Sequence, residues 1–255
     1  MLGRLEAIAA KASWMLWSYF KDRRGKNIVG VREGDVTRAV DAEMEEYIYK
    51  MLKSSFEGGV LIAEEGGVYR WGDERYVFVV DPLDGSLNYS LGIPIFAISI
   101  AGGRRRDETL ADLEYGVLAV PSTGDIYSYS PEAGALKNGR SLQRRTEASN
   151  VVFAAMGEAV PAAVFEKMAS MGLKGRSLGC SSLELLLTAL NAAVGFVDFR
   201  RKLRALDIAA SLVIGRAMGL KYVIWGDHSL HAKGISILAG SDWFINEFRG
   251  LGGGG

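Results

Sequence analysis

The chain has 255 residues, of which 49% are hydrophobic and 24% charged. Its 30 Lys and Arg residues balance its 30 Asp and Glu residues, so the composition predicts a globular protein and gives no electrostatic case for a nucleic-acid or membrane partner. Cys180 is the only cysteine, which excludes an intrachain disulfide and suits the cytoplasm. The charged first turns and the lack of an 18-residue uncharged apolar stretch lead us to expect neither a signal peptide nor a membrane span.

The first part of the chain combines helices with a strand-rich stretch. Apolar spacing predicts helices over residues 2–21 and about 37–53. The polar, glycine-containing segment 22–35 between them predicts a mobile loop. Short apolar runs bounded by Gly or Pro then predict strands from "GGVLIAEEGG" to "GDIYSYS".

After residue 150, strands and helices alternate. The expected helices lie near residues 161–171, 179–195 and 206–219, and the expected closing strands at 221–227 and 235–240. A polar segment at 140–150 suggests a loose boundary within one compact unit. We therefore expect an N-terminal α+β half, residues 1–145, and a C-terminal α/β half, residues 146–255.

Acidic residues recur at the ends of apolar segments. "VLIAEE" ends in Glu64 and Glu65, "VFVVDPLD" contains Asp81 and Asp84, and "LRALDIAAS" carries Asp207 at the start of an apolar helix. If these ends converge, the carboxylates cannot all stay ionised without a cation. Oxygen ligands of this kind favour Mg²⁺, which binds a few carboxylates together with substrate phosphate.

Each acidic segment also has a purely structural explanation when it is taken alone. Asp-Pro and Asp-Gly are common in turns, a solvated acid pair can end a strand, and an acid stabilises the first turn of a helix. An EF-hand beginning at Asp81 fails, because Leu83 and Gly92 stand where oxygen ligands are needed. A haloacid-dehalogenase signature fits poorly, because its two acids are two residues apart and those here are three apart.

Together, the motifs resemble those of the inositol monophosphatase and fructose-1,6-bisphosphatase superfamily. "DPLDGSLNY" resembles the family's Asp-Pro-x-Asp-Gly-Thr-x-Asn-Phe, "AEE" its Gly-Glu-Glu, and "LDIAAS" its Trp-Asp-x-Ala-Ala-Gly. The motifs occur in order along nearly the whole chain. "DFRRKLRALD" is most similar to the archaeal dual-specificity members. The resemblance implies an α/β fold of alternating helical layers and mixed sheets, with the site between two halves.

The resemblance also implies roles for individual residues. Glu64, Asp81 and the Leu83 carbonyl would hold one Mg²⁺, and Asp81, Asp84 and Asp207 a second. Glu65, or Asp35 on the preceding loop, would help to hold a third, weaker ion, and Mn²⁺ would serve as a substitute. The remaining roles are orientation of the attacking water by Ser86 with Asp41, and contact with the substrate phosphate by Asp84, Gly85 and Ser86.

Substrate selection would depend on basic residues. Arg200 stands where animal inositol monophosphatases carry a glutamate, and an arginine there favours a second anionic group such as a distal phosphate. Arg176 and Ser181 match further substrate contacts of the archaeal type. A surface ion pair is the structural alternative for Arg200.

The resulting hypothesis is a Mg²⁺-dependent phosphatase of carbohydrate metabolism that hydrolyses inositol-1-phosphate and fructose 1,6-bisphosphate without a covalent intermediate. The resemblance implies a homodimer or homotetramer, and a cytoplasmic role in gluconeogenesis. A 3′-phosphoadenosine 5′-phosphate or NADP phosphatase on the same fold is the alternative substrate class. A non-catalytic sugar-phosphate binder is the alternative of another class.

Overall fold

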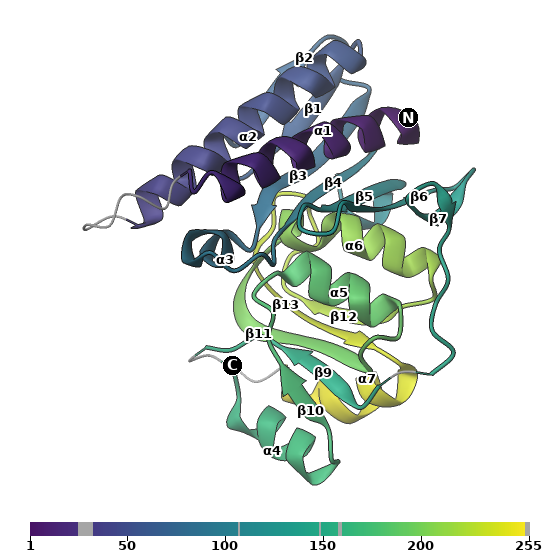
Figure 1. The fold of residues 1–255 in the computed structure, drawn as a ribbon. Coiled ribbons are helices and arrows are strands. Elements are labelled where there is room, and N and C mark those ends of the chain that lie inside the picture. Colours follow the sequence, from purple (N-terminus) through teal and green to yellow (C-terminus); the bar gives the residue numbers. More distant parts are fainter. Residues whose placement is uncertain (25–32, 107, 148, 158–159, 253–255) are drawn as a thin grey trace.

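The computed structural model describes residues 1–255 except 25–32, 107, 148, 158–159 and 253–255, and the side chains of residues 33–38 also lie outside the description. Helices and sheets alternate in layers, with α1 and α2 outermost on one side and α4 and α7 on the other (Figure 1). The helices are α1 (Leu2–Lys21), α2 (Glu33–Ser55), α3 (Ser86–Leu91), α4 (Ala162–Ser170), α5 (Ser181–Ala189), α6 (Ala205–Ala217) and α7 (Asp242–Phe248), with 3₁₀ turns η1 (Leu110–Asp112) and η2 (Arg249–Leu251).

Within the described residues, the strands form two mixed sheets. The first has eight strands in the order β2-β1-β3-β4-β5-β6-β7-β8, and the second has five in the order β10-β9-β11-β13-β12. The strands of the first sheet are β1 (Gly59–Ile62), β2 (Val68–Trp71), β3 (Tyr76–Asp84), β4 (Ala97–Arg104), β5 (Tyr115–Val120), β6 (Asp125–Ser130), β7 (Gly134–Lys137) and β8 (Arg140–Ser141). Those of the second are β9 (Val151–Ala154), β10 (Lys174–Arg176), β11 (Gly195–Arg204), β12 (Lys221–Trp225) and β13 (Lys233–Gly240).

Strand β3 shows how one sheet is buried on both faces. Phe78 and Val80 join the core formed with α1 and α2. The alternate residues Val77 and Val79 join the core formed with α6. Because side chains alternate along a strand, a continuous apolar run of this kind requires a helical layer on each side.

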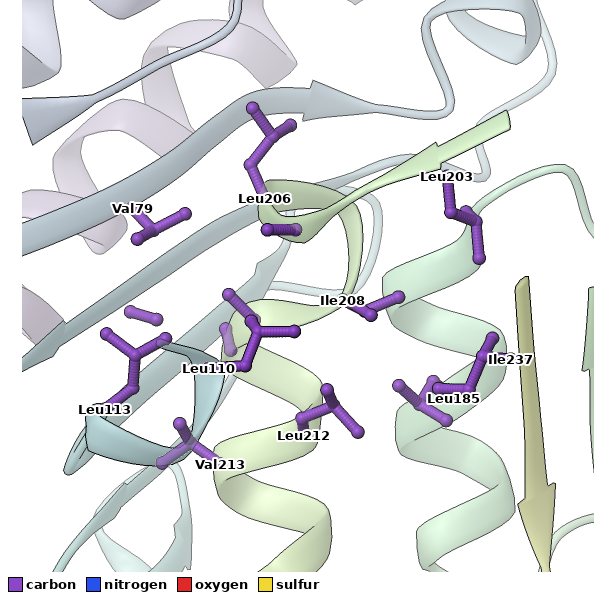
Figure 2. Close-up of a cluster of buried hydrophobic side chains, with 14 of the residues drawn as sticks. Val79, Leu110, Leu113, Leu185, Leu203, Leu206, Ile208, Leu212, Val213 and Ile237 are labelled. Atoms are coloured by element: carbon purple, nitrogen blue, oxygen red, sulfur yellow. The ribbon is translucent and has the colours of Figure 1, made fainter. Parts of the chain in front are cut away.

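Helix α6 lies in the middle layer and is buried from Ala205 to Gly215. Figure 2 shows Ile208 and Leu212 on the side of α6 toward Leu185 of α5, and Val213 on the side toward Leu113. A helix that is apolar on all sides needs neighbours all round. This packing places the start of α6, with Asp207, between the two sheets.

The predicted fold class is confirmed, and several element boundaries are corrected. Helix α2 begins at Glu33, earlier than the predicted start near residue 37, so residues 33–35 of the predicted loop are helical. Acidic residues favour a first helical turn, a signal that the neighbouring glycine obscured. Residues 22–24 of that loop form a turn, and residues 25–32 lie outside the described residues.

Two differences occur in the second half of the chain. Helix α5 ends at Ala189, before the predicted end at 195, because Asn191 has a φ of 59° that breaks the helical path. The chain closes with α7 after the last strand, whereas strands alone were expected there. At seven residues, α7 is too short to show a clear helical period. Among the helices of the described residues, none combines the length and apolarity that a membrane span requires.

Candidate active site

The end of β3 brings two carboxylates to one cavity. In a regular strand, residues three apart face opposite sides of the sheet. Here Asp81 pairs with Ser99 and Asp84 with Ala97, so three steps on β3 match two on β4 and the strand is bulged. Pro82, which lacks a backbone N–H, lies within the bulge. The bulge explains how Asp81 and Asp84 both line the same cavity.

The chain turns sharply after Asp84. Gly85 has a φ of 91°, and a Cβ added there would lie 2.8 Å from the Ile95 carbonyl oxygen. Only glycine meets both requirements at low cost. The turn places Ser86 at the start of α3 and in the cavity lining. Within the bulge, the Leu83 N–H donates to Asp81 Oδ1 at 3.0 Å, which orients that carboxylate.

Glu64 is presented by the tight turn between β1 and β2. Glu45 of α2 is only 1% exposed, and its carboxylate accepts hydrogen bonds from the N–H groups of Glu65 (2.8 Å) and Gly66 (2.7 Å) and from the Tyr69 hydroxyl (2.9 Å). These three bonds anchor the turn to α2. Glu64 lines the cavity, whereas Glu65 is exposed and lies outside its lining.

Asp207 reaches the cavity from the first turn of α6. Its Oδ2 accepts from the Arg204 N–H at 2.8 Å, which caps the helix. Its Oδ1 lies 3.3 Å from Arg204 Nη2 in an ion pair without hydrogen-bonding geometry. Arg204 Nη1 is also 2.6 Å from Glu64 Oε1. One guanidinium therefore joins acids that come from the two halves of the chain.

Asp84 is held by a segment that sequence reasoning missed. Its Oδ2 accepts from Ser182 N–H (2.7 Å), Ser182 Oγ (2.5 Å) and Cys180 Sγ (3.1 Å), and its Oδ1 accepts from Ser181 N–H at 3.3 Å. These donors begin α5, where the helix dipole also favours a negative charge. Serines before an apolar helix indicate a helix N-terminus, but no local feature of the sequence indicates that the N-terminus of α5 hydrogen-bonds to Asp84.

The electrostatics of the cluster favour a bound cation. Burial, followed by the charges of Asp84 and Asp207, raises the pKa of Asp81 well above its usual range. Burial raises the pKa of Asp207 to about 7. Burial, followed by repulsion from Glu64, raises the pKa of Asp41 to about 8. Acids that protonate this readily become stable anions when a divalent ion lies among them.

The donor set fits a hard divalent ion. Five carboxylates line the cavity, and four of them, from Glu64, Asp81, Asp84 and Asp207, form the expected ligand set, while the fifth belongs to Glu184. Asp207 Oδ1 is buried without a hydrogen-bond donor. Oxygen-only ligands of this kind are what Mg²⁺ and Mn²⁺ bind. In the described part of the chain, no three acidic, histidine or cysteine side chains already converge as a ligand group, and Arg204 holds two of the four carboxylates.

The cavity has a volume of about 440 Å³ and lies between the two halves of the chain. Basic side chains share it with the acids. Arg200 lines it and forms a bidentate ion pair with Asp198, with Arg200 Nε 3.0 Å from Asp198 Oδ1 and Arg200 Nη2 2.5 Å from Asp198 Oδ2. Asp198 is fully buried, so this pairing orients the arginine firmly. Lys202 also lines the cavity and forms no ion pair within the described residues.

The other residues expected at the site have different positions. Ser181 lines the cavity, but Arg176 is exposed on β10, outside the lining, and donates to the Gly175 carbonyl at 2.7 Å. Asp41 is buried behind the lining, and no hydrogen bond joins it to Ser86 among the described residues. The Asp35 side chain lies outside the described residues.

Comparisons with known proteins agree with this architecture. The inositol monophosphatase family model matches residues 2–249. The fructose-1,6-bisphosphatase of Pyrococcus furiosus is 32% identical over 206 residues, covering 79% of this chain and 75% of the relative. A fructose-1,6-bisphosphatase/inositol-1-monophosphatase of Methanothermobacter thermautotrophicus is 31% identical over 198 residues, covering 73% and 70%. A Pyrococcus horikoshii protein described as similar to inositol-1 monophosphatase has a solved structure with a TM-score of 0.75, 26% identity and 98% coverage of both chains.

Proposed function

Because the chain belongs to the inositol monophosphatase family, and is thereby a phosphoric monoester hydrolase, we propose that it hydrolyses inositol-1-phosphate and fructose 1,6-bisphosphate with bound Mg²⁺. The observation that carries the proposal is one cavity lined both by the four carboxylates of the expected ligand set and by an oriented arginine. The carboxylates suit divalent ions, and the arginine suits an anionic group of the substrate.

Specific residues would bind each divalent ion. Glu64, Asp81 and the Leu83 carbonyl would bind one, and Asp81, Asp84 and Asp207 a second. Mg²⁺ bound there lowers the pKa of water and stabilises the negative charge that develops on the phosphate and leaving oxygens. A third, weaker ion would involve Glu65 or Asp35, and Mn²⁺ would substitute for Mg²⁺.

The chain's own groups would handle the proton and the phosphate. The Ser86 hydroxyl would orient the attacking water and pass its proton toward Asp41, which is buried close to the acids. The N–H groups of Gly85 and Ser86 would donate to phosphate oxygens. The water would attack phosphorus directly as the P–O bond to the sugar or inositol oxygen breaks, and that oxygen would leave as an alcohol after taking a proton from solvent, so no phospho-enzyme forms.

The second anionic group of the substrate would meet Arg200. Its bidentate pairing with the buried Asp198 leaves it ordered before substrate arrives, which reduces the entropy lost on binding. Arg176 and Ser181 would add contacts to the sugar or its phosphate. This arrangement favours a bisphosphate without excluding a monophosphate.

A nucleotide is the second candidate substrate. Leu87 and Met156 line the same cavity with 67% and 56% of their surfaces exposed. Such apolar rims pack against a base better than against a hydroxylated sugar. A 3′-phosphoadenosine 5′-phosphate or NADP phosphatase would use the same acids.

The proposal also covers the oligomeric state of the protein and its cellular role. The halves 1–145 and 146–255 each contain one of the two sheets, which supports two units that close around the site. We propose a cytoplasmic homodimer or homotetramer acting in carbohydrate metabolism, including gluconeogenesis. Light scattering on the purified protein measures the assembly directly.

The test is phosphate release from inositol-1-phosphate and fructose 1,6-bisphosphate, each measured with Mg²⁺ and with EDTA. We expect Mg²⁺-dependent release from both, and a loss of at least about a thousandfold in Asp84→Asn, because an amide is a poor ligand for a hard cation. Asp73→Asn, an exposed acid outside the cavity, is the matched control. An active Asp84→Asn enzyme would contradict the site. Release from nucleotides alone would favour the second candidate, and binding without turnover a non-catalytic binder.

A further inference from the structure

Arg204 occupies an unusual position among the acids of the cavity. Its guanidinium lies 2.6 Å from Glu64 Oε1 and 3.3 Å from Asp207 Oδ1. The three side chains are 30%, 23% and 13% exposed, so solvent weakens these ion pairs only in part. Among the described residues, no other ion pair involves a carboxylate that lines the cavity.

The two acids that Arg204 holds would serve both proposed ions. Glu64 belongs to the first ligand set and Asp207 to the second. The guanidinium takes up one lone pair of Glu64 Oε1 that a cation could otherwise use, and a guanidinium and a divalent ion repel each other at this range. Loading the site therefore costs free energy as long as the Arg204 guanidinium stays beside these acids.

The surroundings of Arg204 leave room for such a rearrangement. Glu64 and Arg204 line the main cavity and also a second one of about 190 Å³, bordered by Gly67, Leu206 and Ala232. The ion pair thus forms part of the wall between two spaces. Its side chains can turn without displacing the packed residues of the core.

On this geometry, which rests on the proposed metal site, we propose that Arg204 is a built-in competitor for the divalent ions. Its positive charge offsets the repulsion among the carboxylates and opposes the binding of ions. Arg204 thereby stabilises the ion-free protein and weakens ion affinity.

Ion affinity and ion-free stability test the proposal directly. Equilibrium dialysis or calorimetry with Mn²⁺ and Mg²⁺ gives the dissociation constants, and thermal melting in EDTA gives the stability. In Arg204→Gln we expect tighter binding by about tenfold or more, the order expected when a unit charge is removed a few ångströms from a divalent ion. We also expect a lower melting temperature in EDTA and a larger rise when Mn²⁺ is added.

Lys202→Gln is the matched control. It removes one positive charge from the same cavity but breaks no ion pair among the described residues. The affinity of this variant for ions should change by about threefold or less, because the exposed Lys202 ammonium interacts with a bound ion only across solvent, which screens its charge. Arg204→Lys keeps the charge and loses the fork geometry, so it should bind ions with an affinity between wild type and Arg204→Gln.

Two results would overturn the inference. If both Arg204 variants bind ions as weakly as wild type or more weakly, Arg204 orients the ligands and does not compete. If Arg204→Gln fails to fold, the affinity of Arg204→Lys still decides between these roles. A wild-type protein that binds neither ion would sink the proposed function as well, which distinguishes the two failures.

Discussion

Asp84 and Glu64 line the same cavity, yet they are held in opposite ways. Asp84 accepts hydrogen bonds from Cys180, Ser181 and Ser182, all neutral donors fixed at the start of a helix. Among the described residues, Glu64 has one charged partner, Arg204, on a flexible side chain. The first carboxylate is fixed by neutral donors, whereas the second is paired with a positive charge that would oppose a cation beside it. One side of the site is therefore preorganised, and the other is adjustable.

The backbones beneath the two acids repeat this contrast. Beside Asp84, Gly85 is crowded by the Ile95 carbonyl and by the backbone of Phe96. On the Glu64 turn, a Cβ added at Gly67 would meet nothing within 4 Å. Both glycines have positive φ, 91° and 75°, so only the packing differs.

Gly85→Ala should have the largest effect on this contrast. An L-residue is strained at that φ, and its Cβ would lie 2.8 Å from a backbone oxygen that cannot move freely. We expect a loss of about 3 kcal/mol or more in the free energy of unfolding, together with loss of phosphatase activity. Urea denaturation followed by circular dichroism measures the first quantity.

Gly67→Ala is the control for Gly85→Ala. It meets the same unfavourable φ without the clash, so it should cost only about 1 kcal/mol and leave activity nearly intact. Equal losses in both variants would show that the positive φ alone sets the cost and that crowding at Gly85 does not distinguish the two sides of the site.

Glu45→Gln should affect the adjustable side. A glutamine has one acceptor oxygen where the glutamate uses two, so an N–H of Glu65 or Gly66 would face an amide hydrogen. We expect the free energy of unfolding to fall by about 2 kcal/mol. We also expect the Mg²⁺ concentration needed for half-maximal activity to rise several-fold, because the turn that carries Glu64 is loosened.

Tyr69→Phe separates these two effects. It removes one donor to Glu45 and leaves both turn N–H groups bonded. Its cost should be about 1 kcal/mol, with the Mg²⁺ activation constant unchanged. A weaker activation constant in Tyr69→Phe as well would mean that general destabilisation, and not the position of Glu64, controls Mg²⁺ activation.

The preorganised side shows which features the sequence could predict. The Asp81–Asp84 spacing is local, and a strand that ends in a turn is readable from Pro82 and Gly85. The alternating layers followed from motifs in family order. In contrast, the donors from Cys180 to Ser182 lie 96 to 98 residues from Asp84, and only tertiary packing joins them.

The adjustable side was harder to predict. Arg204 lies three residues before Asp207, a spacing that suggests an interaction across one helical turn, yet its ion pair with Glu64 joins distant segments. The anchoring role of Glu45 was equally hard to predict, because the sequence does not distinguish a buried acid in a helix from an exposed one. Short elements such as α7 carry too few residues for their period to show.

The last prediction concerns pH and the segment that holds Asp84. Glu184 of α5 lines the cavity, and its carboxylate accepts from the Leu178 N–H. Burial, with a further contribution from the charge of Asp84, raises its pKa to about 7. The folded protein therefore keeps a proton on Glu184 at pH values where the unfolded chain, with a pKa of 4.5, has lost it.

Stability must then fall as pH rises between these two pKa values, because the folded state binds more protons there. In EDTA, the wild-type free energy of unfolding should decrease relative to that of Glu184→Gln by up to about 1.4 kcal/mol per pH unit between pH 4.5 and 7. Comparing the two slopes removes the contributions of the other acids, which both proteins share. Parallel slopes would mean that Glu184 is ionised in the folded protein, so that the N–H groups around it outweigh its burial and the preorganised side tolerates a second buried charge beside Asp84.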